Sequence, residues 1–251
     1  MLIDMMNIPL RLAVFLLVAT FVGGATGKSH AGDQQPLTVV ELYTSQGCSS
    51  CPRADAYLGE LADRAERERL LPLSFHVDYW DYLGWKDPYS SRKNSDRQRL
   101  YAQYMEQRYV YTPQMVIQGT YQVTGSDRAS VDHAIMAAGK KKPLDITMRK
   151  EGNDIIVSLP GLSTTVNANL FVVLYDDAHT TKIKRGENRG EELENRNVVR
   201  YLKKVAHWKG SASEIPFTLP VSKDGRRDGC AVLLQSADTG HILGAQKIQL
   251  N

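Results

Sequence analysis

The feature that most constrains this chain is a pair of cysteines, Cys48 and Cys51, placed between a β-type run and a helical one. Thr38–Tyr43 is apolar and β-branched, and residues 52–69 repeat apolar side chains every three or four positions. This pattern predicts a strand followed by an amphipathic helix. The first N–H groups of a helix lack partners and its dipole end is positive, so a thiolate there has a lowered pKa. We therefore predict that Cys48 is a nucleophile and Cys51 its resolving thiol.

The dipeptide Thr112-Pro113 stands just before another β-type run. Proline cannot donate a hydrogen bond to a sheet, so it suits the start of a strand, and X-Pro is the bond at which a cis peptide costs little. A cis bond would turn the Thr112 backbone toward the cysteines, where it could pair with an extended peptide. The sequence thus predicts Pro113 in a catalytic site and Thr112 as a substrate-binding residue.

The remaining pattern divides the chain at the polar segment 140–143. Before it, strands and helices alternate in the order β-α-β-α-β-β-α. After it come seven short β-type runs separated by turn signals and no clear helix, which is typical of a sandwich. We predict an α/β domain over 36–140 and an all-β, sandwich-like domain over 144–251.

Composition and charge exclude several classes of protein. The chain has 251 residues, and 31 basic against 28 acidic side chains leave a net charge of +3. That excess is too small to indicate a nucleic-acid partner. Three cysteines are too few for a multi-disulfide scaffold, so each one needs its own explanation.

The N-terminus has the pattern of a secretory signal. Arg11 precedes an apolar run over 12–22, and small residues follow at 23–25. The run is shorter than the roughly 20 residues of a membrane span. We predict a cleaved signal peptide within 1–31, with an uncleaved anchor as the alternative. The mature protein is then periplasmic or secreted, without stable membrane insertion, in a compartment where disulfides persist.

Several motifs together resemble a secreted family labelled domain of unknown function 1223: VELYTSQGCSSCP, FHVDYWDYLGWKDPYSSR, RYVYTPQMVIQG and RGENRG with NVVR. The N-terminal motifs also resemble a thioredoxin-like domain of the short, glutaredoxin-like variety. This resemblance implies a thioredoxin-like fold for the first domain and export from bacteria, with no established activity. It also implies Cys48 as nucleophile, Cys51 as resolving cysteine and Pro113 as the cis-proline. The Ser-Ser pair between the cysteines and the following Pro52 depart from the familiar redox members.

Two further side chains have competing interpretations. Glu41 interrupts an apolar strand. We favour a solvent-facing position for it, although a buried Glu41 could relay a proton to or from Cys51. Cys230 lies in an apolar run and is expected to be a buried, inert thiol, with a resolving role across a domain interface as the minor alternative.

The aromatic segment after the second predicted strand contains Tyr79, Trp80 and Trp85. Ligands bind at the strand ends of open α/β sheets, so these residues either bind substrate or fill the seam between the two domains. His76 beside the cysteines is a weak candidate metal ligand. Zinc would need four ligands, although Cu(I) needs fewer.

The charge-dense segments 185–188 and 191–196 are interpreted as a solvated loop. The alternative is a loop that folds back toward the cysteines.

The leading hypothesis is an exported thiol–disulfide oxidoreductase that acts on protein thiols or disulfides without a cofactor. One alternative is a non-catalytic protein-binding module in which the cysteines form a permanent disulfide. The other is a copper-handling metallochaperone.

Overall fold

The computed structural model describes residues 36–221 and 227–250, so the predicted signal peptide over 1–31 lies outside the described residues. The elements from residue 38 to residue 138 are β1 (Thr38–Thr44), α1 (Pro52–Asp63), α2 (Ala65–Glu68), β2 (Leu70–His76), the short 3-10 helix η1 (Asp81–Leu83), α3 (Arg92–Tyr104), β3 (Gln114–Ile117), β4 (Tyr121–Thr124) and α4 (Arg128–Ala138). The later elements are β5 (Thr147–Glu151), β6 (Asp154–Leu159), β7 (Ala168–Lys182), β8 (Glu192–Trp208), β9 (Ser213–Thr218), β10 (Gly229–Ser236) and β11 (Ile242–Gln249). Over these ranges, no helix has the length and apolar character that crossing a bilayer requires.

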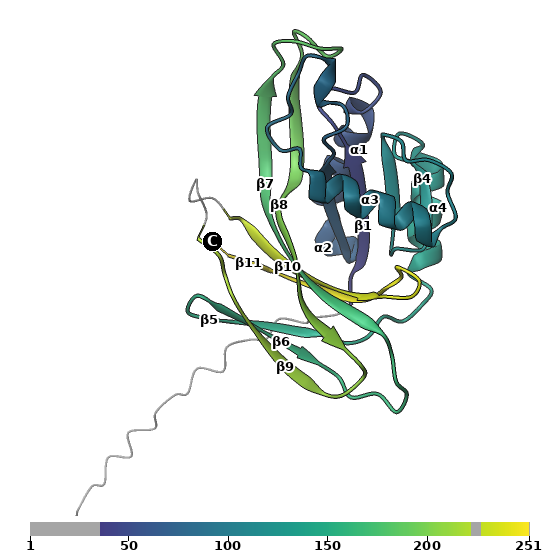
Figure 1. Ribbon diagram of the computed structural model, residues 1–251, viewed down its shortest axis with the longest axis vertical. Helices are drawn as coiled ribbons and strands as arrows, with labels where there is room; N and C mark the ends of the chain where they lie inside the picture. The colour runs from purple at the N-terminus through teal and green to yellow at the C-terminus, as the bar shows by residue number, and fades with distance from the viewer. Residues whose placement is uncertain (1–35, 222–226, 251) are drawn as a thin grey trace, which may run out of the picture. The chain divides into compact units, whose positions relative to one another are not determined.

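The strands form one mixed eight-stranded sheet and one three-stranded sheet (Figure 1). The large sheet has the order β11-β10-β7-β8-β2-β1-β3-β4, and the small one has the order β5-β6-β9. Strand β2 runs parallel to β1 on one side and to β8 on the other. The segments before and after residues 140–143 therefore share one continuous sheet.

This arrangement shows that the predicted fold class, a thioredoxin-like domain followed by a separate sandwich-like domain, is wrong. The protein is mostly β, and its helices are few. The reason lies in β7 and β10, which are apolar on both faces. Alternate side chains of a strand point to opposite faces. Leu170 and Val172 pack toward the three-stranded sheet, whereas Val173 and Ala231 pack into a core shared with β1 and α3. An independent sandwich would expose one of these faces to solvent.

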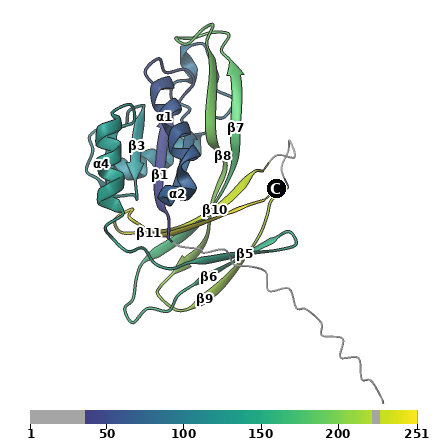
Figure 2. The ribbon, with the colours of Figure 1, turned by 180° about the vertical axis from the view of Figure 1, so that it is seen from behind.

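The same alternation separates two cores on either side of β1. Val39 and Tyr43 belong to the core on the α3 side, and Val40 and Leu42 belong to the core under α1 and α4. Figure 1 looks onto the α3 side of β1, and Figure 2 shows α1 and α2 on the opposite side. At its C-terminal end β1 leaves the apolar core with the buried Thr44, and the chain turns there toward the cysteines.

Strands β7 and β8 are longer than the runs predicted for them. The sequence predicts strands over 168–175 and 198–208, whereas β7 continues to Lys182 and β8 begins at Glu192. The added residues are polar and charged, so they lack the apolar pattern by which strands are recognised. They carry the tip of the β7–β8 hairpin to the loop that holds the cysteines.

Candidate functional site

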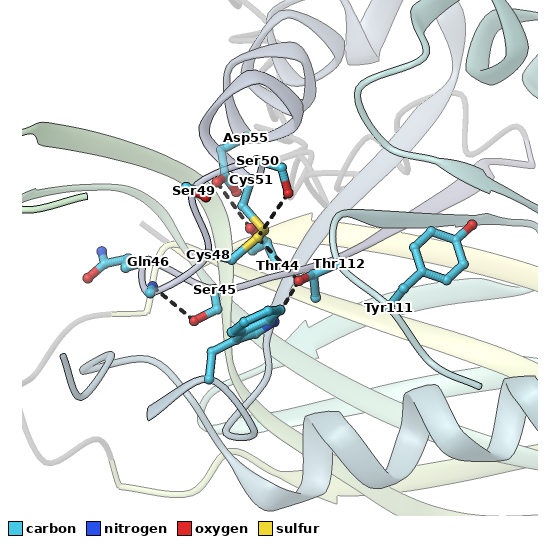
Figure 3. The surroundings of a disulfide bond; sticks show 12 residues. Thr44, Ser45, Gln46, Cys48, Ser49, Ser50, Cys51, Asp55, Tyr111 and Thr112 are labelled. Carbon is cyan, nitrogen blue, oxygen red and sulfur yellow. Dashed lines mark hydrogen bonds between the residues drawn. A yellow bond between two sulfur atoms is a disulfide. The ribbon is translucent and has the colours of Figure 1, made fainter. Parts of the chain in front are cut away.

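Cys48 and Cys51 form a disulfide in the segment that connects the end of β1 to the start of α1. Their Cα atoms are 5.5 Å apart. Cys51 is the N-cap of α1 and Pro52 is its first residue, a position at which proline's missing N–H and fixed φ are tolerated. Figure 3 shows the two cysteines at the end of the helix, with Asp55 beyond Cys51. The predicted position of the pair at a strand-to-helix junction is therefore what the structure has.

The loop at Thr112 and Pro113 lies against the sulfur of Cys48. The Thr112-Pro113 peptide is cis, and the Thr112 hydroxyl donates a hydrogen bond to Cys48 Sγ over 3.3 Å (Figure 3). Trp80 Nε1 donates to Thr112 Oγ1 over 2.7 Å. The exposed fraction of Cys48 is 2% and that of Cys51 is 0%. The structure thus brings together five residues that the sequence predicted for the site, and neighbouring side chains cover the two sulfurs.

The other two aromatic residues predicted for this loop lie farther from the cysteines. Trp85 Nε1 donates to Gln46 Oε1 over 3.1 Å, which ties the aromatic segment to the turn before Cys48. The Tyr79 hydroxyl donates to Gln98 Oε1 of α3 over 3.0 Å. Burial raises the pKa of Tyr79 to about 12. Trp80 binds Thr112 directly, Tyr79 also interacts with Thr112, and Trp85 binds the turn before the cysteines.

The segment after β7 folds back onto the cysteine loop. Asn188 Nδ2 donates to the carbonyls of Gln46 and Cys48 over 2.9 and 3.0 Å. Glu187 Oε2 accepts a hydrogen bond from the N–H of Ser49 over 3.0 Å, and this bond lowers the pKa of Glu187. The favoured interpretation of this segment as a solvated loop is wrong at these residues, and the alternative holds. These hydrogen bonds fix the hairpin to the backbone of the cysteine loop that precedes the helix.

Glu41 is fully buried, so the favoured solvent-facing interpretation is also wrong. Its carboxylate binds Arg97 of α3 over 2.6 and 2.8 Å and accepts hydrogen bonds from the hydroxyls of Tyr43 and Tyr101. Because β1 alternates, Glu41 lies on the α3 side of the sheet, opposite to α1 and Cys51. Its contacts are thus with a buried ion-pair cluster, and the position predicted for a proton relay is not beside Cys51.

A different carboxylate lies beside the cysteines, and the sequence analysis missed it. Asp55 is one helical turn beyond Cys51 and accepts a hydrogen bond from the Thr44 hydroxyl over 3.0 Å. Burial raises the pKa of Asp55 to about 7, against an opposing effect of His76. The sequence does contain a sign that Asp55 is buried near Cys51, because residues four apart share one face of a helix. Asp55 is four residues after Cys51 and three before the buried Leu58, so it belongs to the buried stripe of α1.

His76 is buried at the end of β2 and is paired with Asp87 from the aromatic segment. Its Nδ1 lies 2.7 Å from Asp87 Oδ2. The same carboxylate accepts a hydrogen bond from the N–H of Gln46 over 2.8 Å. Among the described residues no group of three or more His, Cys, Asp or Glu side chains could hold a metal ion. His76 is therefore linked through Asp87 to the turn before Cys48.

Cys230 lies in β10, within the core between the two sheets. It is a free thiol with no exposed surface, and burial raises its pKa to about 12. A thiol with such a pKa is not a nucleophile at neutral pH, so the inert role predicted for it agrees with its surroundings.

Comparisons with known proteins add a family but no activity. The family described as a protein of unknown function, DUF1223, matches residues 39–235. The crystal structure of protein AGR_C_4864 from Agrobacterium tumefaciens is similar, with 29% identity, a TM-score of 0.71, and coverage of 87% of this chain and 96% of that one. HBP35 of Porphyromonas gingivalis is 13% identical with a TM-score of 0.57, over 87% of this chain and 76% of that one, so its likeness concerns the fold alone. No curated protein matches the chain.

Proposed function

The chain belongs to the DUF1223 family of proteins of unknown function, and we propose that it is an exported thiol–disulfide oxidoreductase. The observation that supports this proposal is the set of groups around one disulfide. Cys48 lies three residues before Cys51, which is the N-cap of α1, and the Thr112 hydroxyl donates a hydrogen bond to the sulfur of Cys48. A buried acid with a pKa of about 7 lies one turn beyond Cys51. The helix N-terminus and the hydroxyl stabilise a leaving thiolate at Cys48, and the acid supplies a proton to Cys51.

Written from the oxidised form, the reaction begins with a thiolate of a protein substrate. It attacks Cys48 Sγ, a substrate–Cys48 bond forms, and the Cys48–Cys51 bond breaks. Cys51 leaves with the electron pair and takes the proton of Asp55. A second substrate thiolate then attacks the substrate sulfur of the mixed disulfide, and Cys48 leaves as a thiolate.

The substrate loses two electrons in this half-reaction and the enzyme gains them. A small-molecule disulfide such as oxidised glutathione completes the cycle by accepting the two electrons through the same steps in reverse. The fold places Asp55 where it can give up its proton in one direction and take it back in the other. A carboxyl group with a pKa near the working pH is suited to both.

Cys48 is only 2% exposed, so the residues that cover its sulfur control whether a substrate can react with it. A substrate reaches Cys48 only after Thr112, Trp80 or the hairpin residues 187–188 move. Thr112 and Glu187 each bind the cysteine loop through one hydrogen bond, Trp80 binds Thr112 through one, and Asn188 binds the loop through two. Such bonds open at small cost when water replaces them. We therefore expect exchange to be limited by access and not by the reactivity of the thiolate.

The same low exposure favours a second candidate function, a protein-binding module in which the disulfide is permanent. In that case the disulfide would hold the turn between β1 and α1, and the aromatic segment would bind the partner. The two candidates differ in one measurable property, which is whether the disulfide cycles at neutral pH.

The experiment compares the mature protein with Cys48→Ser and Cys51→Ala. Insulin serves as the disulfide probe, with dithiothreitol as the reductant and insulin precipitation as the readout. We expect the mature protein to accelerate precipitation, Cys48→Ser to abolish the acceleration, and Cys51→Ala to accumulate a mixed disulfide that mass spectrometry identifies. Cys230→Ala is the matched control and should behave as the unaltered protein.

A disulfide that dithiothreitol leaves oxidised at pH 7, together with no acceleration, would exclude the oxidoreductase and select the binding module. Export is tested separately by expressing the full chain and sequencing the N-terminus of the processed protein. We expect cleavage within residues 1–31, and an unprocessed cytoplasmic chain would contradict export.

A further inference from the structure

We infer that a second buried pair, His76 and Asp87, controls when Asp55 releases and takes up the proton exchanged with Cys51, which makes His76 a positioning residue of the proposed reaction. This inference rests on the function proposed above and deepens it. It is carried by the packing between α1 and the ends of β1 and β2, which the disulfide chemistry alone does not explain.

The sheet register places His76 next to the group that holds Asp55. Strands β1 and β2 are parallel, with Thr44 opposite His76, and Thr44 is the residue whose hydroxyl binds Asp55. On β2, Leu73 and Phe75 face the α3 side while Leu70 faces α1. By alternation the His76 side chain also lies on the α1 side, so Asp55 and His76 converge beneath the cysteine loop.

Two buried polar atoms in this region, His76 Nε2 and Ser74 Oγ, have no hydrogen-bond partner among the described residues. Buried polar groups without partners are uncommon because each loses its bonds to water. Asn195 interacts with the Asp55 carboxylate and lowers its pKa. The unpartnered Nε2 therefore leaves His76 with a free nitrogen on the side of the sheet where Asp55 lies.

The charges that face His76 favour its protonated form. Asp87 lies in the aromatic segment, Asp55 in α1 and Arg200 in β8, and the Tyr89 ring packs edge-on against the imidazole at 5.4 Å. Burial by itself lowers the pKa of His76, but the two carboxylates outweigh both burial and Arg200, and the pKa is raised. The pKa of Asp87 is lowered, since the charge of His76 and its hydrogen bond outweigh burial.

A protonated His76 next to Asp55 limits how far burial raises the pKa of Asp55, so Asp55 can still give up its proton near neutral pH. Burial raises the pKa of Asp55, and the charge of His76 is the largest effect that opposes it. When Asp55 gives its proton to Cys51, the carboxylate that remains is next to a cation and not alone in the core. Asp55 also lines a cavity of about 430 Å³ between α1 and β8, together with Pro52, Leu193 and Arg196. This cavity gives Asp55 a route to solvent for recovering the proton.

The test is a pH titration of the Asp55 carboxyl carbon by NMR in the oxidised mature protein. We expect an apparent pKa near 7 in the unaltered protein. His76→Gln should move it upward by roughly one to three pH units, because a cation is removed. Asp87→Asn has two opposing effects on Asp55, because the charge of Asp87 itself raises the pKa of Asp55 while the same charge keeps His76 protonated, so the sign of the test rests on His76→Gln. His133→Gln, on the exposed face of α4, is the matched control and should leave the titration unchanged.

The result that overturns the inference is an Asp55 titration in His76→Gln equal to that of the unaltered protein. If His76→Gln does not fold, the imidazole nitrogen shifts of the unaltered protein decide, and a neutral His76 at pH 7 overturns the inference. If the protein exchanges thiols but the Asp55 titration does not shift in His76→Gln, only the proposed role of His76 is excluded. If the Asp55 titration shifts in His76→Gln but neither the unaltered protein nor any variant exchanges thiols, the oxidoreductase function is excluded. The proposed proton transfer between Asp55 and Cys51 is then excluded as well.

Discussion

Two buried carboxylates lie on opposite sides of the β1–β2 sheet, and their surroundings differ in one respect. Glu41, on the α3 side, binds Arg97 with both oxygens and accepts two tyrosine hydroxyls as well. Asp55, on the α1 side, accepts the Thr44 hydroxyl and interacts with Asn195, and no arginine or lysine among the described residues forms an ion pair with it. The first carboxylate is saturated by a cation and two hydroxyls, and the second, which lacks such a cation, is not.

The difference indicates which cluster holds the fold and which one can change its state. Arg97 further binds Gln235 of β10, so the Glu41 cluster joins the first strand, a helix and a strand near the C-terminus. Burial and the charge of Glu41 raise the pKa of Tyr43 and of Tyr101 well above 10, and Arg97 opposes them. The two tyrosines therefore stay protonated near neutral pH. Asp55, with a pKa of about 7, changes its protonation there.

The largest expected effect comes from breaking the saturated cluster. Arg97→Met leaves Glu41 buried and without a counter-ion, and removing one partner of a buried pair costs about 3–5 kcal/mol. We expect the free energy of unfolding at pH 7, measured with urea, to fall by that amount. The double variant Glu41→Gln/Arg97→Met should recover part of the loss, because no charge then remains in the core.

Arg99→Met is the matched control for this prediction. Arg99 is on the same helix, its side chain is 41% exposed, and it binds the exposed Asp96. Surface pairs contribute little to stability, so Arg99→Met should unfold as the unaltered protein does. Equal losses from the two substitutions would show that the Glu41 cluster is not what holds α3 to the sheet.

The second prediction concerns Asp55, the unsaturated carboxylate. Its substitution is expected to raise the free energy of unfolding, whereas Arg97→Met lowers it. Burial raises the folded-state pKa of Asp55 from 3.8 to about 7. Its contribution to stability is therefore complete below pH 3.8 and is lost as the pH rises to about 7. A shift of this size corresponds to at most about 4 kcal/mol. Asp55→Asn, which is neutral at every pH, should be more stable than the unaltered protein above pH 7 by up to this amount, and slower in insulin reduction.

The measurement is the free energy of unfolding from pH 4 to pH 8 for the unaltered protein, Asp55→Asn and Asp63→Asn. Asp63 is at the exposed end of the same helix, beside Arg196, and its substitution should give a curve parallel to that of the unaltered protein. If Asp55→Asn also gives a parallel curve, Asp55 ionises in the folded protein as it does in water, and the contrast with Glu41 is lost.

The sequence predicts the local elements well because they rest on local patterns. The strand before Cys48, the helix after Pro52 and most strands of the second half are present near their predicted bounds, whereas β7 and β8 extend beyond theirs. Their assembly could not be read in the same way. Strand β2 pairs with β8 across more than a hundred residues of sequence, and nothing in a single strand names its neighbour. The two apolar faces of β10 were the available sign that it lies between two layers.

The residues of the site likewise fall into those that local sequence patterns predict and those that only the tertiary structure reveals. Cys48, Cys51, Thr112 and Pro113 are recognisable from spacing and from the chemistry of each residue, and the structure brings them together. Asn188 and Asp87 reach the cysteine loop from distant segments, and no spacing rule connects them to it. Glu41 was assigned to the wrong environment because a carboxylate in an apolar strand has two possible partners, water or a buried cation, and Arg97 is more than fifty residues away.

The smallest expected effect concerns a third carboxylate, Glu187, which faces the same cysteine loop from the exposed hairpin. It accepts the hydrogen bond of Ser49 N–H at the helix end that would stabilise a Cys48 thiolate. A negative charge there disfavours the thiolate, so Glu187→Gln should lower the pKa of Cys48 in the reduced protein, by a few tenths of a pH unit. The thiolate absorbance near 240 nm measures this.

Glu191→Gln, exposed in the same connection, is the control and should leave the Cys48 titration unchanged. The shift caused by Glu187→Gln should also fade at 1 M salt, where charges separated by more than about 3 Å are screened at the surface. A buried carboxylate such as Asp55 is screened much less, so its influence on Cys51 should persist at the same salt concentration. If salt removed both effects equally, Asp55 would act as a surface charge, and the difference between a buried proton donor and an exposed one would not explain the chemistry of this disulfide.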